Sequence, residues 1–171
     1  MATFKTAFDK MIKNEGGYKL HSVDGDRGGQ TYAGIARNYN PNWLGWSLID
    51  NQRMDRPELT VLVSNFYQEN YWNKVRGCEI ESQHVAESLF DFAVNAGTKT
   101  ASKLAQIAVG AAPDGVIGPQ TLESINAVDE ELFILKYALA KVARYAEICN
   151  RDRGQSKFLL GWTNRTIAGL S

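Results

Sequence analysis

Two adjacent glycines end the first predicted helix of this chain, and an acidic residue stands directly before them. From Thr3 to Asn14, apolar residues recur at the three- and four-residue spacing typical of an amphipathic helix, at Phe4, Phe8, Met11 and Ile12. The next position on this apolar stripe is Glu15. Gly16 and Gly17 then end the helix, because glycine adopts backbone angles that other residues resist.

This position constrains the chemistry of Glu15. A carboxyl group at the end of a helix, against its apolar face, is partly removed from water. We therefore expect the pKa of Glu15 to be raised, so that the side chain keeps a proton near neutral pH. A protonated carboxyl group in a cleft is suited to act as a general acid.

Composition excludes several other classes of protein. The 171 residues fit one domain, or one domain with a small packed lobe. No apolar run is long enough to span a membrane, and the first residues lack the apolar core of a secretory signal. His21 and His84 stand apart from the two cysteines, so we expect neither a metal site nor a cofactor.

The zero net charge hides an asymmetry along the chain. Residues 1–135 carry 12 Lys and Arg against 17 Asp and Glu, whereas residues 136–171 carry 7 against 2. The basic segment could favour an anionic polymer, or it could be a solvated helix face that balances an acidic body. Its cations are spread out and no helix-turn-helix or RNA-binding motif is present, so we do not expect nucleic acid binding.

Hydrophobic periodicity predicts a mainly α protein. Residues 21–35 are rich in Gly and Asp and predict a loop or short hairpin, and residues 40–46 form another irregular stretch. Helices are predicted from Pro57 onward, over 83–96 with Gly97 as the stop, over 100–109, from Gln120, over 129–149 and in a final segment. The helix over 129–149 carries apolar residues at helical spacing, at Leu132, Leu135, Leu139, Val142, Ala143 and Ala146.

Candidate catalytic residues cluster between Glu15 and Ile35. Asp24, Asp26 and Thr31 follow Glu15 across a glycine-rich turn. Cleavage of a glycosidic bond needs an acid to protonate the leaving oxygen, and a second polar group to stabilise the oxocarbenium-like carbon or to activate water. A turn of this kind could place a second carboxylate across a cleft from the first.

The motifs of this region resemble those of a known family. Glu15-Gly16-Gly17-Tyr18 followed by residues 26–35 (DRGGQTYAGI) is similar to the EGGY…DxGGxTxxGI signature of glycoside hydrolase family 108. That family comprises phage endolysins and the bacterial muramidases once called secretion activator proteins. The resemblance continues through residues 66–72, 89–97 and 158–165, and residues 114–122 resemble a turn of the family's peptidoglycan-binding-like segment.

The resemblance implies a fold and a domain organisation. The expected fold is a lysozyme-like helical fold with a small glycine-rich loop or hairpin and a C-terminal helical peptidoglycan-binding-like segment. Residues 1–97 would form the catalytic region and residues 98–171 the C-terminal segment, packed together as one compact unit.

The resemblance also implies an activity, which is cleavage of the β-1,4 bond between N-acetylmuramic acid and N-acetylglucosamine. Glu15 would be the catalytic acid, and Asp26 in the DxGG block would assist it, with Asp24 as its rival. Thr31 could orient a water molecule or could satisfy the backbone of the turn. The spacing of the acids does not decide between an inverting and a retaining route.

Five residues are candidates for binding the substrate, and Asp24 is one of them. Tyr18 and Tyr32 flank the acidic block, and an aromatic ring with a polar tip suits a saccharide cleft. Gln30 lies within the DxGGxT block. Asn95, near the end of the helix over 83–96, could bond a sugar N-acetyl group or could tie down the helix end.

Two other functions remain open. A lytic transglycosylase would also use a single acid, and a non-catalytic module could bind peptidoglycan without cleaving it. We expect a monomer that is made without a signal peptide and acts in the periplasm or cell wall on glycan strands. The family precedent for its export is a holin or a dedicated secretion route.

Overall fold

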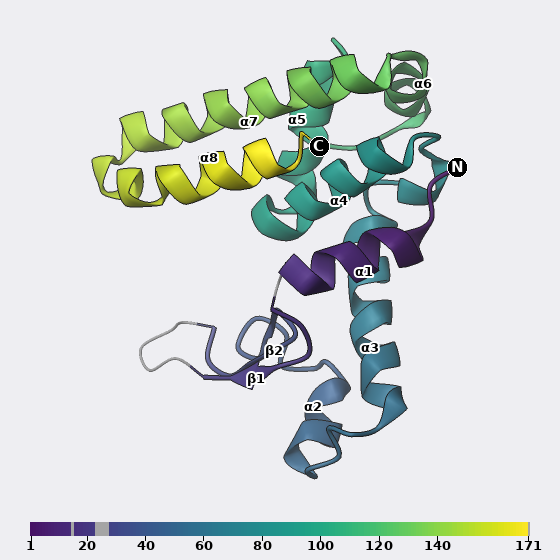
Figure 1. Cartoon of the computed structure of the whole chain (residues 1–171), viewed down its shortest axis with the longest axis vertical. Coiled ribbons are helices and arrows are strands. Elements are labelled where there is room, and N and C mark those ends of the chain that lie inside the picture. The colour runs from purple at the N-terminus through teal and green to yellow at the C-terminus, as the bar shows by residue number, and fades with distance from the viewer. Residues whose placement is uncertain (15, 23–27, 171) are drawn as a thin grey trace. The chain divides into compact units, whose positions relative to one another are not determined.

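Figure 1 shows a computed structural model of the chain, which describes residues 1–14, 16–22 and 28–170. Three predicted site residues, Glu15, Asp24 and Asp26, lie outside the described residues. Contacts divide the chain into two units, one formed by Phe4–Asn70 and the other by Met1–Thr3 with Tyr71–Ser171. This division differs from the domain boundary predicted at residue 97.

The first unit combines helices with a small antiparallel sheet in the order β1-β2-β3. The described elements are α1 (Phe4–Asn14), β1 (Leu20–His21), β2 (Thr31–Tyr32), β3 (Ile35–Ala36), α2 (Gly45–Asp50) and α3 (Pro57–Tyr67). Helix α3 continues into the π-helical turn η1 (Gln68–Trp72), whose last two residues belong to the second unit. Proline at the first position of α3 starts that helix as predicted. Helix α2 overlaps the stretch predicted as irregular (residues 40–46) only at its first two residues, and no helix was predicted over the rest of it.

The second unit is helical throughout its described elements. These are η2 (Gly77–Glu79), α4 (Gln83–Ala96), α5 (Thr98–Ala108), α6 (Pro119–Ala127), α7 (Glu130–Arg151), η3 (Arg153–Phe158) and α8 (Leu159–Ala168). The predicted fold class, mainly α with a small hairpin and a helical C-terminal segment, is confirmed. In the described part of the chain, no helix combines the length and apolar character needed to cross a bilayer.

Helix α1 ends in a tight glycine turn. Its inward face buries Ala7, Phe8, Met11 and Ile12. Gly16 donates its N–H to the carbonyl of Lys13 at 3.2 Å, and Gly17 donates to the carbonyl of Ile12 at 2.9 Å. Both glycines have positive φ (86° and 80°), which side chains other than hydrogen resist. This pattern is a Schellman turn, and it confirms the predicted end of the helix.

A two-residue turn joins β2 to β3. Tyr32 pairs with Ile35, and the two residues between them, Ala33 and Gly34, both have positive φ (48° and 80°). Two positive φ values define the type I′ turn that matches the twist of a hairpin. Ala33 is fully buried, and its carbonyl accepts a hydrogen bond from the hydroxyl of Tyr67 at 2.8 Å. This bond attaches the hairpin to α3.

Helix α7 buries a different face from the one its leucines suggest. The inward face carries Phe133, Ile134, Tyr137, Lys141, Tyr145 and Cys149. The leucine face points outward, with Leu135 54% exposed and Leu139 70% exposed. Phe133 and Tyr137 stack with ring centroids 5.4 Å apart, and Phe92 of α4 meets Tyr137 edge-on at 5.9 Å. The aromatic residues therefore form the core contacts of this helix.

A single amide organises the loop between α5 and α6. Gln106 is 1% exposed. Its Nε2 donates to Asp114 Oδ1 at 2.7 Å, to the Val116 carbonyl at 3.0 Å and to Thr121 Oγ1 at 3.3 Å. Its Oε1 accepts the N–H of Gly115 at 2.8 Å. These four hydrogen bonds attach the Gln106 side chain to residues 114–116 and to Thr121.

Lys141 is a buried cation in the core of the second unit. The residue is 7% exposed, and its Nζ lies 4.3 Å from the Tyr137 ring centroid and 3.3 Å from Ser88 Oγ, to which it donates. Burial lowers the pKa of Lys141 from 10.5 to about 8; Asp91 acts to raise it and Arg165 to lower it further. Asp91 is itself paired with Arg165, at 2.9 Å.

We predict that Lys141→Met stabilises the protein at pH 7 by about 1 to 3 kcal/mol, because the buried charge is removed. The unfolded chain holds the Lys141 proton more tightly than the folded chain. Stability of the parent should therefore rise between about pH 8 and pH 10.5 through this group, and the variant should lack that rise. Urea unfolding across this pH range measures both effects.

The exposed Lys136 on the same helix provides the control. Lys136→Met should change the free energy of unfolding by less than about 0.5 kcal/mol. The prediction is wrong if Lys141→Met is less stable than its parent at pH 7 and its stability still rises between about pH 8 and pH 10.5. The buried ammonium would then be net stabilising.

Candidate functional site

The described part of the candidate site is built from two neighbouring segments. Strand β1 pairs with β2, so that Leu20 lies opposite Tyr32 and His21 opposite Thr31. The N–H of Ala33 donates to the Lys19 carbonyl at 3.2 Å. The sheet therefore places the residues that follow the α1 glycine turn beside the predicted Thr31 and Tyr32.

Thr31 is half-buried on β2, and its hydroxyl contacts its own turn. Its Oγ1 donates to the Gly29 carbonyl at 3.4 Å, which is long for a hydrogen bond of this kind. The contact corresponds to the structural role that the sequence left open for this hydroxyl. The catalytic role of Thr31 stays a prediction.

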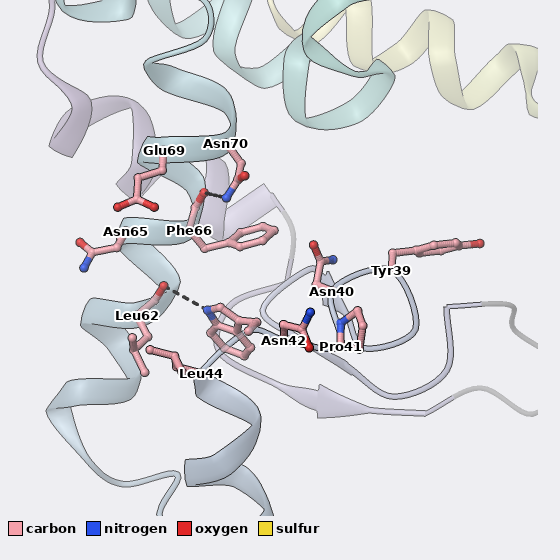
Figure 2. A pocket seen from close by; sticks show the side chains of 11 residues that line it. Tyr39, Asn40, Pro41, Asn42, Leu44, Leu62, Asn65, Phe66, Glu69 and Asn70 are labelled. Atoms are coloured by element: carbon pink, nitrogen blue, oxygen red, sulfur yellow. Dashed lines mark hydrogen bonds between the residues drawn. The ribbon is translucent and has the colours of Figure 1, made fainter.

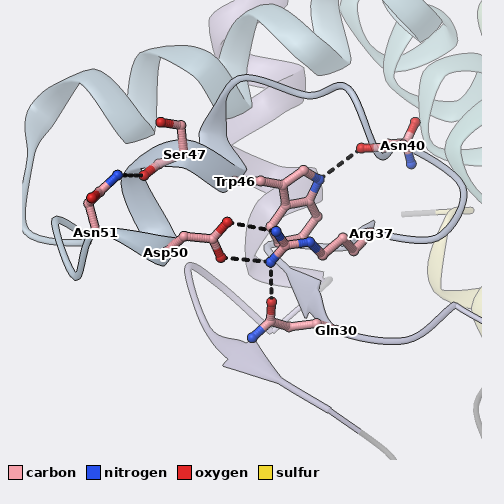
Figure 3. A network of polar contacts seen from close by, with 7 residues as sticks. All are labelled: Gln30, Arg37, Asn40, Trp46, Ser47, Asp50 and Asn51. Atoms are coloured by element: carbon pink, nitrogen blue, oxygen red, sulfur yellow. Dashed lines mark hydrogen bonds and ion pairs between the residues drawn. The ribbon is translucent and has the colours of Figure 1, made fainter.

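Gln30 belongs to a polar network on the other side of the hairpin, shown in Figure 3. Arg37 Nη1 donates to Gln30 Oε1 at 2.9 Å, and the guanidinium binds both carboxylate oxygens of Asp50 at 2.8 and 2.7 Å. The hydrogen bond and charge of Arg37 lower the pKa of the Asp50 carboxyl. The same guanidinium lies 5.0 Å from the centroid of the Trp46 ring.

This network fixes the orientation of the Gln30 amide. Because its oxygen is taken by Arg37, the NH₂ group remains to donate to a ligand. No other bond of this side chain to a described residue is present. Both donors of the amide, and the second lone pair of its oxygen, therefore remain for the predicted substrate contact.

The two candidate tyrosines differ in exposure. Tyr18 is 41% exposed, and its partial burial, followed by the charge of Asp9, raises the pKa of its hydroxyl. Tyr32 is 4% exposed, and its ring stacks on Trp43 with centroids 6.3 Å apart. Tyr18 retains ring surface for a sugar, whereas the ring of Tyr32 packs in the core. Their substrate-binding roles stay predictions.

Asn95 lies in the other unit, on the last turn of α4. Gly97 ends this helix at φ +87° and donates its N–H to the Ala93 carbonyl at 2.9 Å. The side chain of Asn95 is exposed and bonds to none of the described residues, so the glycine, and not this amide, closes the helix. A sugar contact by Asn95 stays a prediction.

One group of polar residues was missed by the sequence analysis. A pocket of about 530 Å³ lies between residues 39–44 and the α3–η1 segment, as Figure 2 shows. Its lining includes Asn40, Asn42, Trp43, Asn65 and Glu69. The only sequence signal was Asn-Pro-Asn-Trp at residues 40–43, which reads as an irregular turn, and nothing in the pattern links it to α3.

Comparison with known proteins gives two family matches and a structural relative. Residues 8–97 match the family described as Glycosyl hydrolase 108, and residues 100–167 match the family described as Predicted Peptidoglycan domain. A structure titled "Structure of Brucella abortus SagA" is similar over 98% of this chain and 91% of that one, with 28% identity and a TM-score of 0.71. A comparison with the curated proteins finds no match.

These matches confirm the resemblance seen in the EGGY and DxGGxT motifs. They meet between residues 97 and 100, after α4, whereas the contact-based division falls at Asn70 and Tyr71. The first match covers more than half of the chain, and the chain therefore belongs to the glycosyl hydrolase 108 family.

Proposed function

We propose that this protein is an N-acetylmuramidase that cleaves the β-1,4 bond between N-acetylmuramic acid and N-acetylglucosamine in peptidoglycan. One observation carries the proposal: a glycosyl hydrolase match over residues 8–97 is followed in the same chain by a peptidoglycan domain match over residues 100–167. The first match supports cleavage of a glycosidic bond, and the second supports peptidoglycan as the target.

In the proposed mechanism, Glu15 donates a proton to the oxygen of the glycosidic bond as the bond breaks. The buried apolar face of α1 and the hydrogen-bonded turn at Gly16 and Gly17 support this role, because the predicted raised pKa of Glu15 depends on these two features of its sequence neighbours. Asp26, or Asp24 in its place, would stabilise the positive charge that develops on the sugar carbon.

Thr31 would hold the attacking water in an inverting reaction. Inversion needs roughly 6.5–9.5 Å between the two catalytic groups to admit that water, whereas a covalent, retaining route needs about 5–5.5 Å. In either route, Tyr18 would contact a sugar ring and the amide nitrogen of Gln30 would donate to the substrate.

The products of digestion test this proposal. We expect the protein, incubated with purified sacculi, to release fragments that end in reducing N-acetylmuramic acid, as measured by mass spectrometry before and after borohydride reduction. Fragments with a 1,6-anhydro end would assign a lytic transglycosylase instead. Cleaved stem peptides with intact glycan would assign an amidase or endopeptidase.

The proposed place of action is the cell wall, on either of two routes. In phage lysis, a holin would open the inner membrane to the protein. In secretion, a dedicated export pathway would deliver it, and the cut would open the wall locally. Co-expression in a host with and without a holin separates the routes, because only the first predicts lysis that depends on the holin.

A further inference from the structure

We propose that the pocket between residues 39–44 and the α3–η1 segment is a saccharide subsite, and that it holds a neutral N-acetylated sugar of the glycan strand. The proposal rests on the proposed function for the choice of ligand. It assigns a second contact region in the first unit, formed by residues that the catalytic mechanism does not use.

The pocket is open and is lined by aromatic and amide side chains, as Figure 2 shows. Asn65 and Glu69 come from α3 and η1, while Asn40 and Asn42 come from the loop, and the ring of Phe66 lies between the two groups. A volume of about 530 Å³ falls within the range of small-molecule sites. An aromatic surface flanked by amides suits a sugar, which presents an apolar ring face and a polar edge.

Three polar side chains of the pocket are available to a ligand. Asn42, Asn65 and Glu69 are exposed, and their side chains make no hydrogen bond to any residue in the described ranges. The two amides offer both donors and acceptors, as an acetamido group and ring hydroxyls require.

Two further amides are held in fixed orientations. Asn40 Nδ2 donates to the Ala36 carbonyl at 3.0 Å, and Asn70 Nδ2 donates to the Phe66 carbonyl at 2.8 Å. Each bond leaves the side-chain oxygen as an acceptor. Groups that are oriented before a ligand arrives lose less freedom on binding, which favours affinity.

The aromatic part of the pocket is held by a hydrogen bond and by ring packing. Trp43 Nε1 donates to the Leu62 carbonyl at 3.3 Å, and its ring meets Trp46 edge-on at 5.1 Å. A side chain at Gly45 would place its Cβ 2.2 Å from the Trp43 ring, so glycine is required for the indole to lie there. Phe66 meets the same indole at 6.4 Å.

The charged groups that line the pocket favour a neutral ligand over an anion. Among its described lining residues, Glu69 is the charged side chain, and no Lys, Arg or His is present. A lone carboxylate repels phosphate and free carboxylate groups, whereas amides accept a neutral sugar. N-acetylglucosamine is the neutral sugar of the glycan, since N-acetylmuramic acid carries a lactyl group and its peptide.

The backbone conformation of η1 also supports a functional role for this segment. Glu69 and Asn70 lie in η1, a π-helical turn from Gln68 to Trp72. Such turns are rare and frequently occur at functional sites. Both side chains line the pocket.

Binding of N,N′,N″-triacetylchitotriose tests the subsite. The parent protein carries Glu15→Gln, so that the sugar is not consumed during the measurement. We expect calorimetry or NMR titration to show millimolar or tighter binding to this parent. Asn42→Ala with Asn65→Ala should raise Kd about tenfold or more, because two hydrogen-bonding side chains are lost.

Asn73→Ala is the matched control, since Asn73 is an exposed amide that does not line the pocket. It should leave the Kd within about twofold of the parent. Circular dichroism should show the same helix content in all three proteins. No binding to the parent, or a Kd unchanged by the double substitution, overturns the subsite.

A peptide probe separates the glycan from the other component of peptidoglycan. Glu69 could bind the free amine of a stem tetrapeptide that contains diaminopimelic acid. If that peptide binds, Glu69→Gln weakens it and chitotriose does not bind, the pocket is a peptide site and the proposal is wrong.

The subsite and the proposed function fail in different measurements. If digestion of sacculi yields reducing N-acetylmuramic acid but the Kd for chitotriose is unchanged by the substitutions at Asn42 and Asn65, only the subsite proposal is wrong. If the digest yields cleaved stem peptides, the proposed function is wrong. The titration with chitotriose then still tests whether the pocket binds a sugar. In the active protein, the double substitution should raise KM for peptide-free glycan strands with little change in kcat.

Discussion

Replacing Glu15 by Gln is expected to reduce the release of reducing ends from sacculi by about 10³-fold or more, because the amide has the shape of the carboxyl group but cannot donate an acidic proton. The loss should appear in kcat, since the acid acts on the breaking bond. Binding to sacculi in a pull-down assay should persist.

A charge-matched control accompanies this variant. Glu123→Gln removes an exposed carboxylate of α6 and should leave activity within about twofold of the parent. Thermal unfolding followed by circular dichroism should give nearly the same Tm for all three proteins. A Glu15→Gln protein with full activity would refute the assignment of the acid. If Asp26→Asn keeps part of the activity and Asp24→Asn is inactive, Asp24 is the second catalytic residue.

Replacing Gln106 by Ala is expected to destabilise the protein by about 3 kcal/mol. The amide makes four hydrogen bonds in a buried site, so its loss leaves the Gly115 N–H, the Val116 carbonyl and the Thr121 hydroxyl without this partner. The Thr121 hydroxyl, which is buried, and the cavity left by the side chain carry most of this cost. Urea unfolding at pH 7 measures the change.

An exposed glutamine of the following helix serves as the comparison. Gln120→Ala should shift the free energy of unfolding by less than about 0.5 kcal/mol. In the parent protein, Gln106 Nε2 also donates a hydrogen bond to Asp114. This bond, followed by the one from the Val116 N–H, lowers the pKa of the Asp114 carboxyl. The stabilisation from this carboxylate is therefore present above its ordinary pKa and is lost as the pH falls through the lowered value. Equal urea midpoints for parent and Gln106→Ala would exclude a structural role for the amide.

The sequence predicted those features that depend on local backbone chemistry. The end of α1 at Gly16 and Gly17 and the end of α4 before Gly97 follow from glycine at positions of positive φ. The start of α3 follows from Pro57. The hairpin after β1 was expected in outline, although its pairing was not, because two-residue strands carry too little alternation to set a register.

The inward face of α7 could not be predicted from periodicity alone. The helix carries two apolar stripes, and the leucines form the more regular one. The larger rings of Phe133 and Tyr137 pack inside instead, and the chain accepts a buried ammonium at Lys141 with them. Packing against α4 and α5 decides between the stripes, and that information is not local to the helix.

The candidate site was predictable to a different degree at each residue. Glu15, Asp24 and Asp26 rest on motif and family, and their roles remain predictions. Burial of Tyr32 depends on Trp43, which is eleven residues away in the chain, so aromatic character alone could not separate it from Tyr18. The amide pocket unites a loop with a helix, and no short motif describes such a combination.

The hydroxyl of Tyr67 has a geometric consequence for the first unit. It anchors the turn of the hairpin that carries Thr31, while Phe66 beside it on the same helix borders the amide pocket. One helix, α3, thus contacts both the hairpin and the amide pocket. Because α3 contacts both, a change that shifted this helix would move the hairpin and the amide pocket together.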